Sequence, residues 1–432
     1  MKITLIKPGL GTSITGYNLS DGSMEPLQLA VIAGLIKKPD EVIMYDDRLE
    51  QIPFDEPTDL VCITVDTFCA RRAYEISLKY KSRDVNVVLG GIHVSLMPEE
   101  AIDNADAIVI GDVEPVWAEL IRDAKKNKLK RRYFAPFGIP QDGTFPDREI
   151  YKNKNYLPVS LMQFSRGCRF SCTFCSVSRF FKGSHVCRRT EDVLAEIEKD
   201  KLKTILFVDD NLTQNKSELK IFLKELIPLK VKWASQSGID MVHDQELLKL
   251  MADSGCVGNL IGFESINVNS LKWFKKSPNI RDFNTYRDAL AILSDHGFLT
   301  WASFVIGNDF DTVETIDKTV EFAIKNKFAL AYFHILMPYP GTKIYDQFKR
   351  DDRLLYDGKW WLHPDYKYNQ ATFIPKLMSV QQLYEATIKA NKDFYSISSI
   401  GKRAFDPKTN IRNVLNFMIY SRFNYVLRKT SI

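Results

Sequence analysis

The sequence predicts an α/β protein with two successive parallel sheets, a doubly wound sheet followed by a partial (β/α)6 barrel, and then a mostly helical C-terminal tail. Three observations lead to this prediction. Short apolar runs rich in β-branched residues alternate with helical patterns through residues 1–345. A basic, Pro-bearing stretch at residues 125–157 interrupts the alternation. At 432 residues, the chain is also too long for one ordinary hydrophobic core.

The first region, residues 1–140, has the pattern of a Rossmann-like domain. Its expected strands are apolar and short: Ile3–Ile6, Val42–Tyr45, Leu60–Thr64, Val85–Leu89 and Ala107–Ile110. The helices expected between them are Leu27–Ile36, Ala70–Tyr80 and Glu114–Ala124. Ligands of such sheets bind beyond the carboxyl ends of the strands, so residues near those ends are candidate contacts. They are Pro8, Thr67, Gly90, Gly91, His93 and Gly111.

The second region, residues 155–345, is expected to form an open barrel of βα units, with its chemistry at the C-terminal strand ends. The expected strands are Val159–Gln163, Thr204–Val208, Lys232–Ser235, Leu260–Phe263, Thr300–Val305 and Ala331–Leu336. The expected helices are Glu191–Lys199, Ser217–Leu226, Asp244–Ala252, Arg281–Leu293 and Val313–Ile324. We interpret residues 125–157 as a surface linker and residues 346–432 as a mostly helical region.

Composition and charge favour a folded cytoplasmic protein. Hydrophobic residues make up 45% of the chain and charged residues 26%. The 59 Lys and Arg exceed the 54 Asp and Glu by a formal net charge of +5, a scattered surplus that argues against a nucleic-acid partner. We expect neither a signal peptide nor a membrane span, because no apolar run approaches the ~20 residues that a span needs.

Three of the seven cysteines are clustered with the spacing C-x3-C-x2-C, namely Cys168, Cys172 and Cys175. This spacing lets one tight loop direct three sulfurs at a common point. Three thiolates on a four-iron cluster leave one iron without a protein ligand. The alternative is structural zinc completed by Cys187 or His185, although zinc motifs usually pair their ligands in two matched units.

The segment that contains these cysteines, Gln163-Phe-Ser-Arg-Gly-Cys168-Arg-Phe-Ser-Cys172-Thr-Phe-Cys175, resembles the signature of the radical S-adenosylmethionine (SAM) superfamily. Other segments are similar to the branch in which a cobalamin-binding domain precedes the barrel. They are Gly90-Gly-Ile-His-Val-Ser, Ala105–Glu114, Phe207–Asn211, Ile261–Ser265 and Pro338–Thr342. The resemblance covers the first two regions and hardly extends into the tail.

The resemblance implies an enzyme with a [4Fe–4S] cluster, SAM and cobalamin as cofactors. Reductive cleavage of SAM at the open iron would give a 5′-deoxyadenosyl radical, which the barrel positions. It also implies an electron donor such as a flavodoxin or ferredoxin, and a small-molecule or lipid substrate. Two functions stay open. One is cobalamin-dependent methylation of a carbon in specialised or lipid metabolism; the other is a cyclisation, rearrangement or carbon–carbon coupling without methyl transfer.

Polar residues at the ends of barrel strands are candidate contacts of SAM. Asp209 and Asp210 follow the second strand and are expected to accept hydrogen bonds from the ammonium group or the ribose; the alternative is a cap for the next helix. Gln236 and Glu264 end the third and fourth strands. The resemblance adds Phe174, which precedes the third cysteine, and Gly307, which either admits adenine or is a plain turn glycine.

His93 is expected either to contact cobalamin or to be a hydrogen-bonded structural residue. The pattern D-x-H-x-x-G, which supplies a lower axial histidine in many cobalamin proteins, is absent from the sequence. Binding without that ligand is familiar in the resembling branch, so its absence is compatible with cobalamin.

Two features of the tail are open to more than one interpretation. Its aromatic residues either line a substrate pocket or pack the tail; they are Trp360, Trp361, Tyr366 and Tyr368. The segment Asn410–Lys429 has the pattern of a basic amphipathic helix. Its apolar positions are Ile411, Leu415, Met418, Phe423 and Val426. We expect this apolar face to dock onto the barrel; peripheral membrane contact through residues 410–429 is the alternative.

Overall fold

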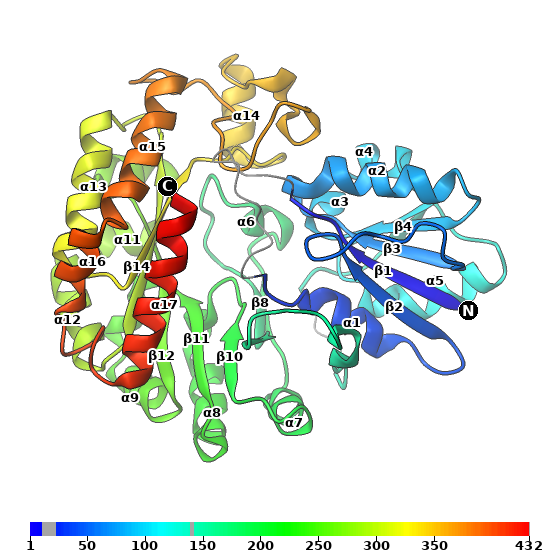
Figure 1. The fold of residues 1–432 in the computed structure, drawn as a ribbon, viewed down its shortest axis with the longest axis horizontal. Coiled ribbons are helices and arrows are strands. Elements are labelled where there is room, and N and C mark those ends of the chain that lie inside the picture. Colours follow the sequence, from blue (N-terminus) through cyan, green and yellow to red (C-terminus); the bar gives the residue numbers. More distant parts are fainter. Residues whose placement is uncertain (11–22, 139–141, 432) are drawn as a thin grey trace. The chain divides into compact units, whose positions relative to one another are not determined.

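The computed structural model describes residues 1–10, 23–138 and 142–431, and contacts within it divide the chain into two compact units. The first unit comprises Met1–Gly167, Arg179–Lys201 and Lys359–Tyr368. The second comprises Cys168–Ser178, Leu202–Gly358 and Asn369–Ile432. Parallel strands flanked by helices form both units, which confirms the predicted fold class (Figure 1). Among the described residues, no helix has both the length and the apolar character needed to cross a bilayer.

The sheet of the first unit is entirely parallel and has the order β2-β1-β3-β4-β5-β6. Its strands are β1 (Lys2–Lys7), β2 (Glu41–Asp46), β3 (Leu60–Thr64), β4 (Asn86–Gly90), β5 (Ala107–Ile110) and β6 (Arg132–Phe134). The helices between them are α1 (Leu27–Leu35), α2 (Ala70–Lys81), α3 (Ile92–Leu96), α4 (Pro98–Asp103) and α5 (Trp117–Lys125). The strand order reverses between β1 and β3, which is where doubly wound sheets bind their ligands.

Strand β6 corrects the interpretation of residues 125–157 as a surface linker. It pairs in parallel with β5 and buries Tyr133, whereas Phe134 beside it is exposed. The alternation that identifies a strand is therefore present, but it extends over only three residues at the end of a basic stretch. A short 3-10 helix, Arg148–Tyr151, follows in the same stretch.

The core of the first unit explains why these segments form their elements. One face of the sheet packs against α1 and α5 through residues such as Leu29, Leu120, Ile3 and Leu5, all fully buried. Helix α2 packs against β3 and β4, and Figure 1 shows it along the opposite side of the sheet from α1. Strands buried on both faces are the reason why the apolar runs in this region are almost continuous.

The second unit contains five parallel strands in which each pairs with the next along the chain. They are β10 (Thr204–Phe207), β11 (Lys232–Ser237), β12 (Cys256–Glu264), β13 (Leu299–Ile306) and β14 (Leu330–Ile335). Their crossover helices include α8 (Lys216–Leu226), α9 (Gln245–Asp253), α12 (Tyr286–Asp295) and α13 (Val313–Lys325). The expected first barrel strand forms as β7 (Ser160–Met162), and α7 (Thr190–Lys199) follows it; both lie in the residue range of the first unit.

The sequence pattern does not predict several short elements, because they contain too few residues to show a helical or strand periodicity. Strands β8 (Ser165–Gly167) and β9 (His185–Cys187) form an antiparallel pair, and α6 (Ser176–Phe180) lies between them in the chain. In the second unit, α10 (Val268–Phe274) and α11 (Ser277–Asp282) follow β12.

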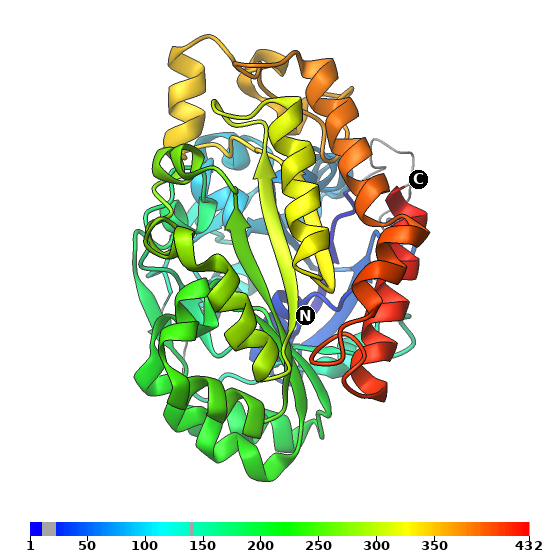
Figure 2. The ribbon, with the colours of Figure 1, turned by 90° about the vertical axis from the view of Figure 1, so that its left-hand side faces the viewer.

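The tail is mostly helical, as predicted. It contains α14 (Lys343–Arg350), α15 (Val380–Phe394), α16 (Ile397–Ala404) and α17 (Val414–Ser431). Helix α15 packs against both α13 and α17, and Figure 2 shows these three helices side by side in yellow, orange and red. The segment Lys359–Tyr368 instead belongs to the first unit, where buried Trp360 lies 5.4 Å from the ring of Phe68. Trp360 and Trp361 are both buried, in agreement with the packing interpretation.

Candidate active site

The three clustered cysteines line one cavity in the second unit. They lie on the loop that precedes α6, and all three are free thiols. Cys172 is buried, whereas Cys168 and Cys175 are half-buried. Other parts of the same wall come from the ends of β10, β11 and β12 and from α11, so that a single loop and the carboxyl ends of three neighbouring strands enclose the space.

Hydrogen bonds fasten the cysteine loop to the second unit. The backbone N–H of Thr173 donates to the carbonyl of Phe274 at 2.9 Å, and its hydroxyl donates to the carbonyl of Trp273 at 3.2 Å. Ser178 Oγ donates to the carbonyl of Phe170 at 2.8 Å. The loop is thus bonded to the end of α10 at Thr173 and is closed on itself between Phe170 and Ser178.

Burial makes the thiols of Cys168 and Cys172 weaker acids while they bind no metal. It raises the pKa of Cys172 to about 12 and also raises the pKa of Cys168. A thiol of that kind is neutral at pH 7, and a bound metal removes its proton because the thiolate is the ligand form.

Four of the six candidate SAM contacts also line this cavity: Phe174, Asp210, Gln236 and Glu264. The ring of Phe174 packs edge-on against Phe274, with the ring centroids 4.8 Å apart. Gln236 Nε2 donates to the carbonyl of Asp210 at 3.2 Å, which links the ends of β10 and β11. The capping alternative for this stretch is wrong, since the N-cap of α8 is Asn215, whose side chain accepts from the N–H of Glu218.

Glu264 is held in an unusual conformation at the end of β12. Its φ of 62° lies in the left-handed region, and the register with β13 shifts between Gly262 and Glu264. The carboxylate turns back over Gly262, where a Cβ atom would lie only 2.3 Å from Glu264 Oε1. A positive φ in a non-glycine residue costs free energy that surrounding contacts must offset, and such residues cluster at functional sites.

Lys276 holds this carboxylate in place. Its ammonium group donates to Glu264 Oε1 at 2.7 Å, and both side chains line the cavity. Burial alone would lower the pKa of Lys276, but the charge of Glu264 and the nearby Cys172 outweigh it and raise that pKa. Asn279 fixes the same turn, because its amide donates to the carbonyls of Gly262 and Phe263 at 3.0 and 3.2 Å.

The other two candidates, Asp209 and Gly307, do not line this cavity. Asp209 is buried, with 1% of its surface exposed. Gly307 has φ 88°, and a Cβ atom at this position would lie 2.6 Å from the side chain of Leu383 in α15. Its N–H donates to Asp311 Oδ2 at 2.9 Å. These surroundings match the interpretation of Gly307 as a turn glycine.

In the first unit, the candidate cobalamin contacts follow the carboxyl ends of the strands. Pro8 and Thr67 follow β1 and β3, the two strands between which the strand order reverses. Lys7 and Asp66 form an ion pair of 2.5 Å at this point, and Lys7 holds the pKa of Asp66 below its usual value. Thr67 itself is buried.

The glycines of this edge have different surroundings. Gly91 and Gly111 have φ of 109° and 95°, and added Cβ atoms would lie within 2.8 and 2.3 Å of the carbonyl oxygens of Val65 and Ala135. Both are thus required by the packing of the chain itself. Gly90, whose nearest neighbour would be 3.8 Å away, has room around it.

His93 is fully buried within the first unit. Its ring nitrogens lie 3.3 Å from Thr67 Oγ1 and 3.2 Å from Glu100 Oε1. Its ring also packs edge-on against Trp361, with the centroids 5.7 Å apart. These surroundings match the interpretation of His93 as a hydrogen-bonded structural residue.

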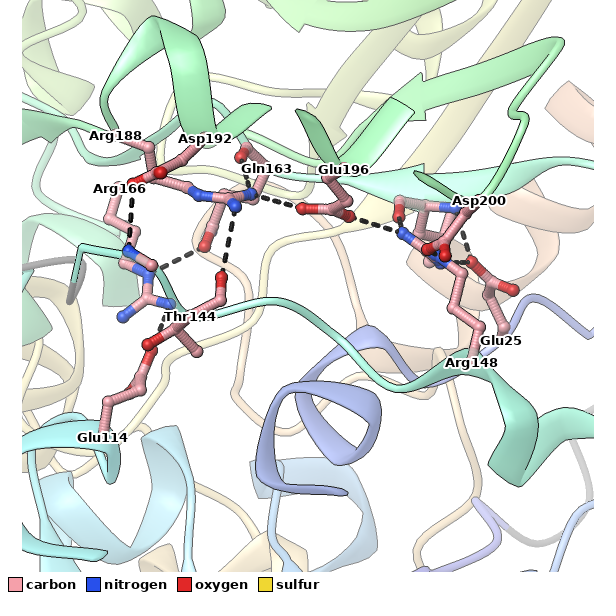
Figure 3. Close-up of polar contacts among 12 residues, drawn as sticks. Glu25, Glu114, Thr144, Arg148, Gln163, Arg166, Arg188, Asp192, Glu196 and Asp200 are labelled. Carbon is pink, nitrogen blue, oxygen red and sulfur yellow. Dashed lines mark hydrogen bonds and ion pairs between the residues drawn. The ribbon is translucent and has the colours of Figure 1, made fainter. Parts of the chain in front are cut away.

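An extended ion-pair network runs through the first unit and reaches the strand before the cysteines (Figure 3). Arg166, in β8, pairs with Glu114 at 2.5 Å and with Asp112 at 3.4 Å. Further along, the fully buried Glu196 accepts from Arg148 and Arg188, each at 2.8 Å. The network therefore ties the loop after β5 to the start of the cysteine segment.

Comparison with known proteins identifies the family. The family model described as the radical SAM superfamily matches residues 162–323, which include the cysteine loop and the ends of β10 to β12. The chain contains a radical SAM domain.

Similarity to curated proteins extends over most of the chain. It is 29% identical to bacteriochlorophyllide d C-12(1)-methyltransferase of Chlorobaculum tepidum, over 97% of this chain and 92% of the relative. It is 26% identical to anaerobic magnesium-protoporphyrin IX monomethyl ester cyclase of Cereibacter sphaeroides, over 91% and 70%. The structure of the radical SAM methyltransferase TsrM from Kitasatospora setae matches 81% of this chain and 76% of its own, with 18% identity and a TM-score of 0.64. That likeness shows a shared fold.

The cavity of this radical SAM enzyme fits the cluster and the SAM that the superfamily binds. Three free thiols on one loop could supply ligands to three irons, which would leave the fourth iron open. Among the described residues, no group of three or more His, Cys, Asp or Glu side chains is arranged to hold a single metal ion. Charged and amide groups for a zwitterionic ligand stand beside the cysteines, namely Asp210, Gln236, Glu264 and Lys276.

Sequence reasoning missed three residues of this radical SAM site. Lys276 and Asn279 line the cavity from α11 and the turn before it, which have no periodic signal and no family motif. Gly262 lies within the quoted segment Ile261–Ser265, two residues before Glu264. The sequence does contain a signal for Gly262, because a glycine inside a strand pattern indicates a bulge or a close approach.

Proposed function

We propose that this radical SAM enzyme transfers a methyl group to a carbon atom, with cobalamin as the methyl carrier. The observation that supports this most is a cavity that combines three free thiols with polar strand ends, in a chain that matches a methyltransferase along nearly its whole length. The first unit adds a doubly wound sheet whose strand order reverses at β1 and β3, the kind of edge that takes a large cofactor.

The cysteines, the polar strand ends and Phe174 each have a role in this proposal. Cys168, Cys172 and Cys175 hold the [4Fe–4S] cluster, which together with SAM supplies a 5′-deoxyadenosyl radical when both are bound. Asp210 accepts hydrogen bonds from the ribose and methionine groups of SAM, and the amide of Gln236 donates to these groups or accepts from them.

Glu264 is proposed to accept from the SAM ammonium group, and Lys276 is a positioning residue that keeps the carboxylate turned into the cavity. Phe174 forms an apolar wall that limits the access of water to the reacting atoms.

Cobalamin is proposed to bind at the carboxyl edge of the first sheet, near Pro8, Thr67, Gly90, Gly91 and Gly111. Gly90 has open space around it, while Gly91 and Gly111 shape the loops on either side. His93 supports this edge through its hydrogen bond with Thr67. With no D-x-H-x-x-G segment in the chain, the proposal gives cobalamin no histidine ligand of that type.

We propose a hydrophobic ring compound or lipid as the substrate. The two relatives described above are named for bacteriochlorophyllide d and magnesium-protoporphyrin IX monomethyl ester, both of which are large ring systems. The proposal also includes a flavodoxin or ferredoxin that supplies electrons, a cytoplasmic location, and peripheral contact with a membrane through residues 410–429.

The second candidate function is a radical cyclisation on the same two units. The similarity to a cyclase over 91% of this chain favours it specifically. The two functions differ in the fate of the methyl group of SAM, because a cyclase forms its new bond within the substrate.

The experiment that separates them uses SAM labelled in its methyl group. With substrate, reductant and cobalamin present, we expect label in the product, and S-adenosylhomocysteine and 5′-deoxyadenosine formed together. An unlabelled product formed at the full rate would contradict methyl transfer and favour the cyclase. Absorption spectra of the protein supplied with hydroxocobalamin test the carrier. A chain that cleaves SAM but takes up no cobalamin would contradict that part of the proposal.

A further inference from the structure

Helix α17 packs against the rest of the second unit mainly through polar side chains, and its Ile419 packs against a small apolar cluster. Asn416, Tyr420 and Asn424 are spaced four residues apart, and each is at most 3% exposed. Tyr420 Oη donates to the carbonyl of Ile400 at 2.6 Å, and Asn424 Nδ2 donates to the carbonyl of Ala329 at 3.0 Å. The helix therefore docks onto the barrel as expected, but not through the apolar positions Leu415 and Met418, which are exposed.

The side chain of Arg403 fixes this orientation of α17. It is fully buried, and its guanidinium donates to Asn424 Oδ1 at 2.8 Å and to the carbonyl of Ala329 at 3.0 Å. Hydrogen bonds of this kind require defined partner positions, whereas apolar packing tolerates rotation of a helix. The face that α17 turns outward is thus set by its buried amide groups.

The outward face of α17 is apolar. Val414 is 75% exposed, and Met418 and Tyr425 are each 59% exposed. At 3.6 residues per turn, these three lie within about 40° of one another on the helix surface. Phe417 is 50% exposed beside them. A surface helix normally turns such residues toward the core, so an outward apolar stripe marks an interaction site.

Basic residues accompany this stripe. Arg422 and Lys429 are exposed on the same side of the helix, and Lys429 Nζ lies 4.5 Å from the ring centre of Tyr425. Arg412 is exposed just before the helix. No Asp or Glu follows Asp406 in the sequence, so the end of the chain carries only positive side-chain charge.

We propose that the outward face of α17, formed by Val414, Phe417, Met418, Arg422, Tyr425 and Lys429, docks on an anionic lipid bilayer. Apolar side chains flanked by Lys and Arg, with an aromatic residue among them, match the apolar interior and negative surface of such a bilayer. The polar underside keeps the helix attached to the enzyme while it lies in the interface. This inference deepens the proposed peripheral membrane contact through residues 410–429, and it does not rest on methyl transfer.

Vesicle flotation with the full chain, loaded with its cluster, tests the proposal. We expect binding to vesicles of phosphatidylglycerol and phosphatidylcholine, weaker binding at higher salt, and little binding to phosphatidylcholine alone. Replacing Val414, Met418 and Tyr425 together with Ser is expected to weaken binding about tenfold or more, through loss of buried apolar area. Arg422→Glu with Lys429→Glu is expected to weaken it by about tenfold as well, through charge.

Matched controls exclude general effects. Ile221 is a 54% exposed apolar residue on α8, and Lys392 is an exposed lysine on α15. Ile221→Ser and Lys392→Glu are expected to bind as the wild type does, with unchanged circular dichroism in every variant. The proposal is wrong if the serine variant floats like the wild type. It is also wrong if the wild type ignores anionic vesicles, or if this face joins two copies of the chain in solution. Vesicle binding without methyl transfer would leave this inference standing and contradict only the proposed function.

Discussion

Two cations of the second unit, the half-buried Lys276 and the fully buried Arg403, differ in what surrounds them. Lys276 pairs with the carboxylate of Glu264 at 2.7 Å and lines the cavity of the cysteines. Arg403 is fully buried and donates to the carbonyls of Phe328 and Phe394, each at 2.9 Å, besides Ala329 and Asn424. Its guanidinium also lies 3.8 Å from the ring centre of Phe394.

The difference shows that the partners of an enclosed charged side chain, rather than its burial alone, indicate whether it has a structural or a functional role. Arg403 directs its donors at backbone and amide oxygens that join α15, α16 and α17 to the sheet, so its bonds hold the tail together. Lys276 instead fixes a carboxylate that faces the cavity lined by the three clustered cysteines. A variant at each position should therefore affect different properties, namely stability at Arg403 and SAM cleavage at the pair of Glu264 and Lys276.

The largest expected effect is on stability. Arg403→Met leaves several buried oxygens without a donor, so we expect the free energy of unfolding to fall by about 4 kcal/mol. Chemical denaturation followed by circular dichroism measures it. Lys402→Met, at an exposed neighbouring position, is the control and should change stability by less than about 0.5 kcal/mol. A stable Arg403→Met protein would show that the buried polar face of α17 is not what holds the helix.

The next effect concerns SAM. Glu264→Gln keeps the shape of the side chain but removes its charge, so we expect SAM binding about 50-fold weaker, as for a lost hydrogen bond between charged groups. Calorimetric titration of the cluster-loaded protein measures affinity, and 5′-deoxyadenosine formation measures cleavage. Glu225→Gln, on the exposed side of α8, should behave as the wild type does. Equal affinity in the two variants would remove Glu264 from the SAM site.

A smaller effect distinguishes Asp311, a buried carboxyl group behind Gly307. Burial raises its pKa to about 7 although three hydrogen bonds to it oppose the shift. Because the folded state holds the proton more tightly than the unfolded chain, this group stabilises the fold below pH 4 and loses that contribution as the pH rises through 7. Between pH 5.5 and pH 8, the wild type should lose about 2 kcal/mol relative to Asp311→Asn. Parallel denaturation curves across this range would contradict the shift.

Helices α13 and α17 show how far the sequence could predict this structure. The pattern of Val313–Ile324 predicts a helix that buries its apolar stripe, and α13 does so through Ile316, Val320 and Ala323. In α17 the helix also forms as expected, but its buried face is polar. The position of Arg403, from a separate helix, decides which face docks, and periodicity carries no information about a partner distant in sequence.

The candidate site divides in the same way. The cysteine triplet is local, so its spacing alone brings the three sulfurs to one cavity. Asp210, Gln236 and Glu264 join them because parallel strands end at one edge, which follows from the strand pattern. Lys276 and the contact of Gly307 with Leu383 depend on how distant segments pack. The spacing of residues in the sequence does not predict such contacts.

The central claim is that Cys168, Cys172 and Cys175 together hold the cluster that cleaves SAM. The most direct test is anaerobic reconstitution of the wild type and of the variant with all three cysteines replaced by Ala, with iron content and 5′-deoxyadenosine measured on the same samples. The wild type should bind about four irons per chain and form 5′-deoxyadenosine with dithionite. The variant should do neither, while Cys256→Ala behaves as the wild type. Stoichiometric zinc in the wild type without iron-dependent cleavage of SAM would contradict the claim.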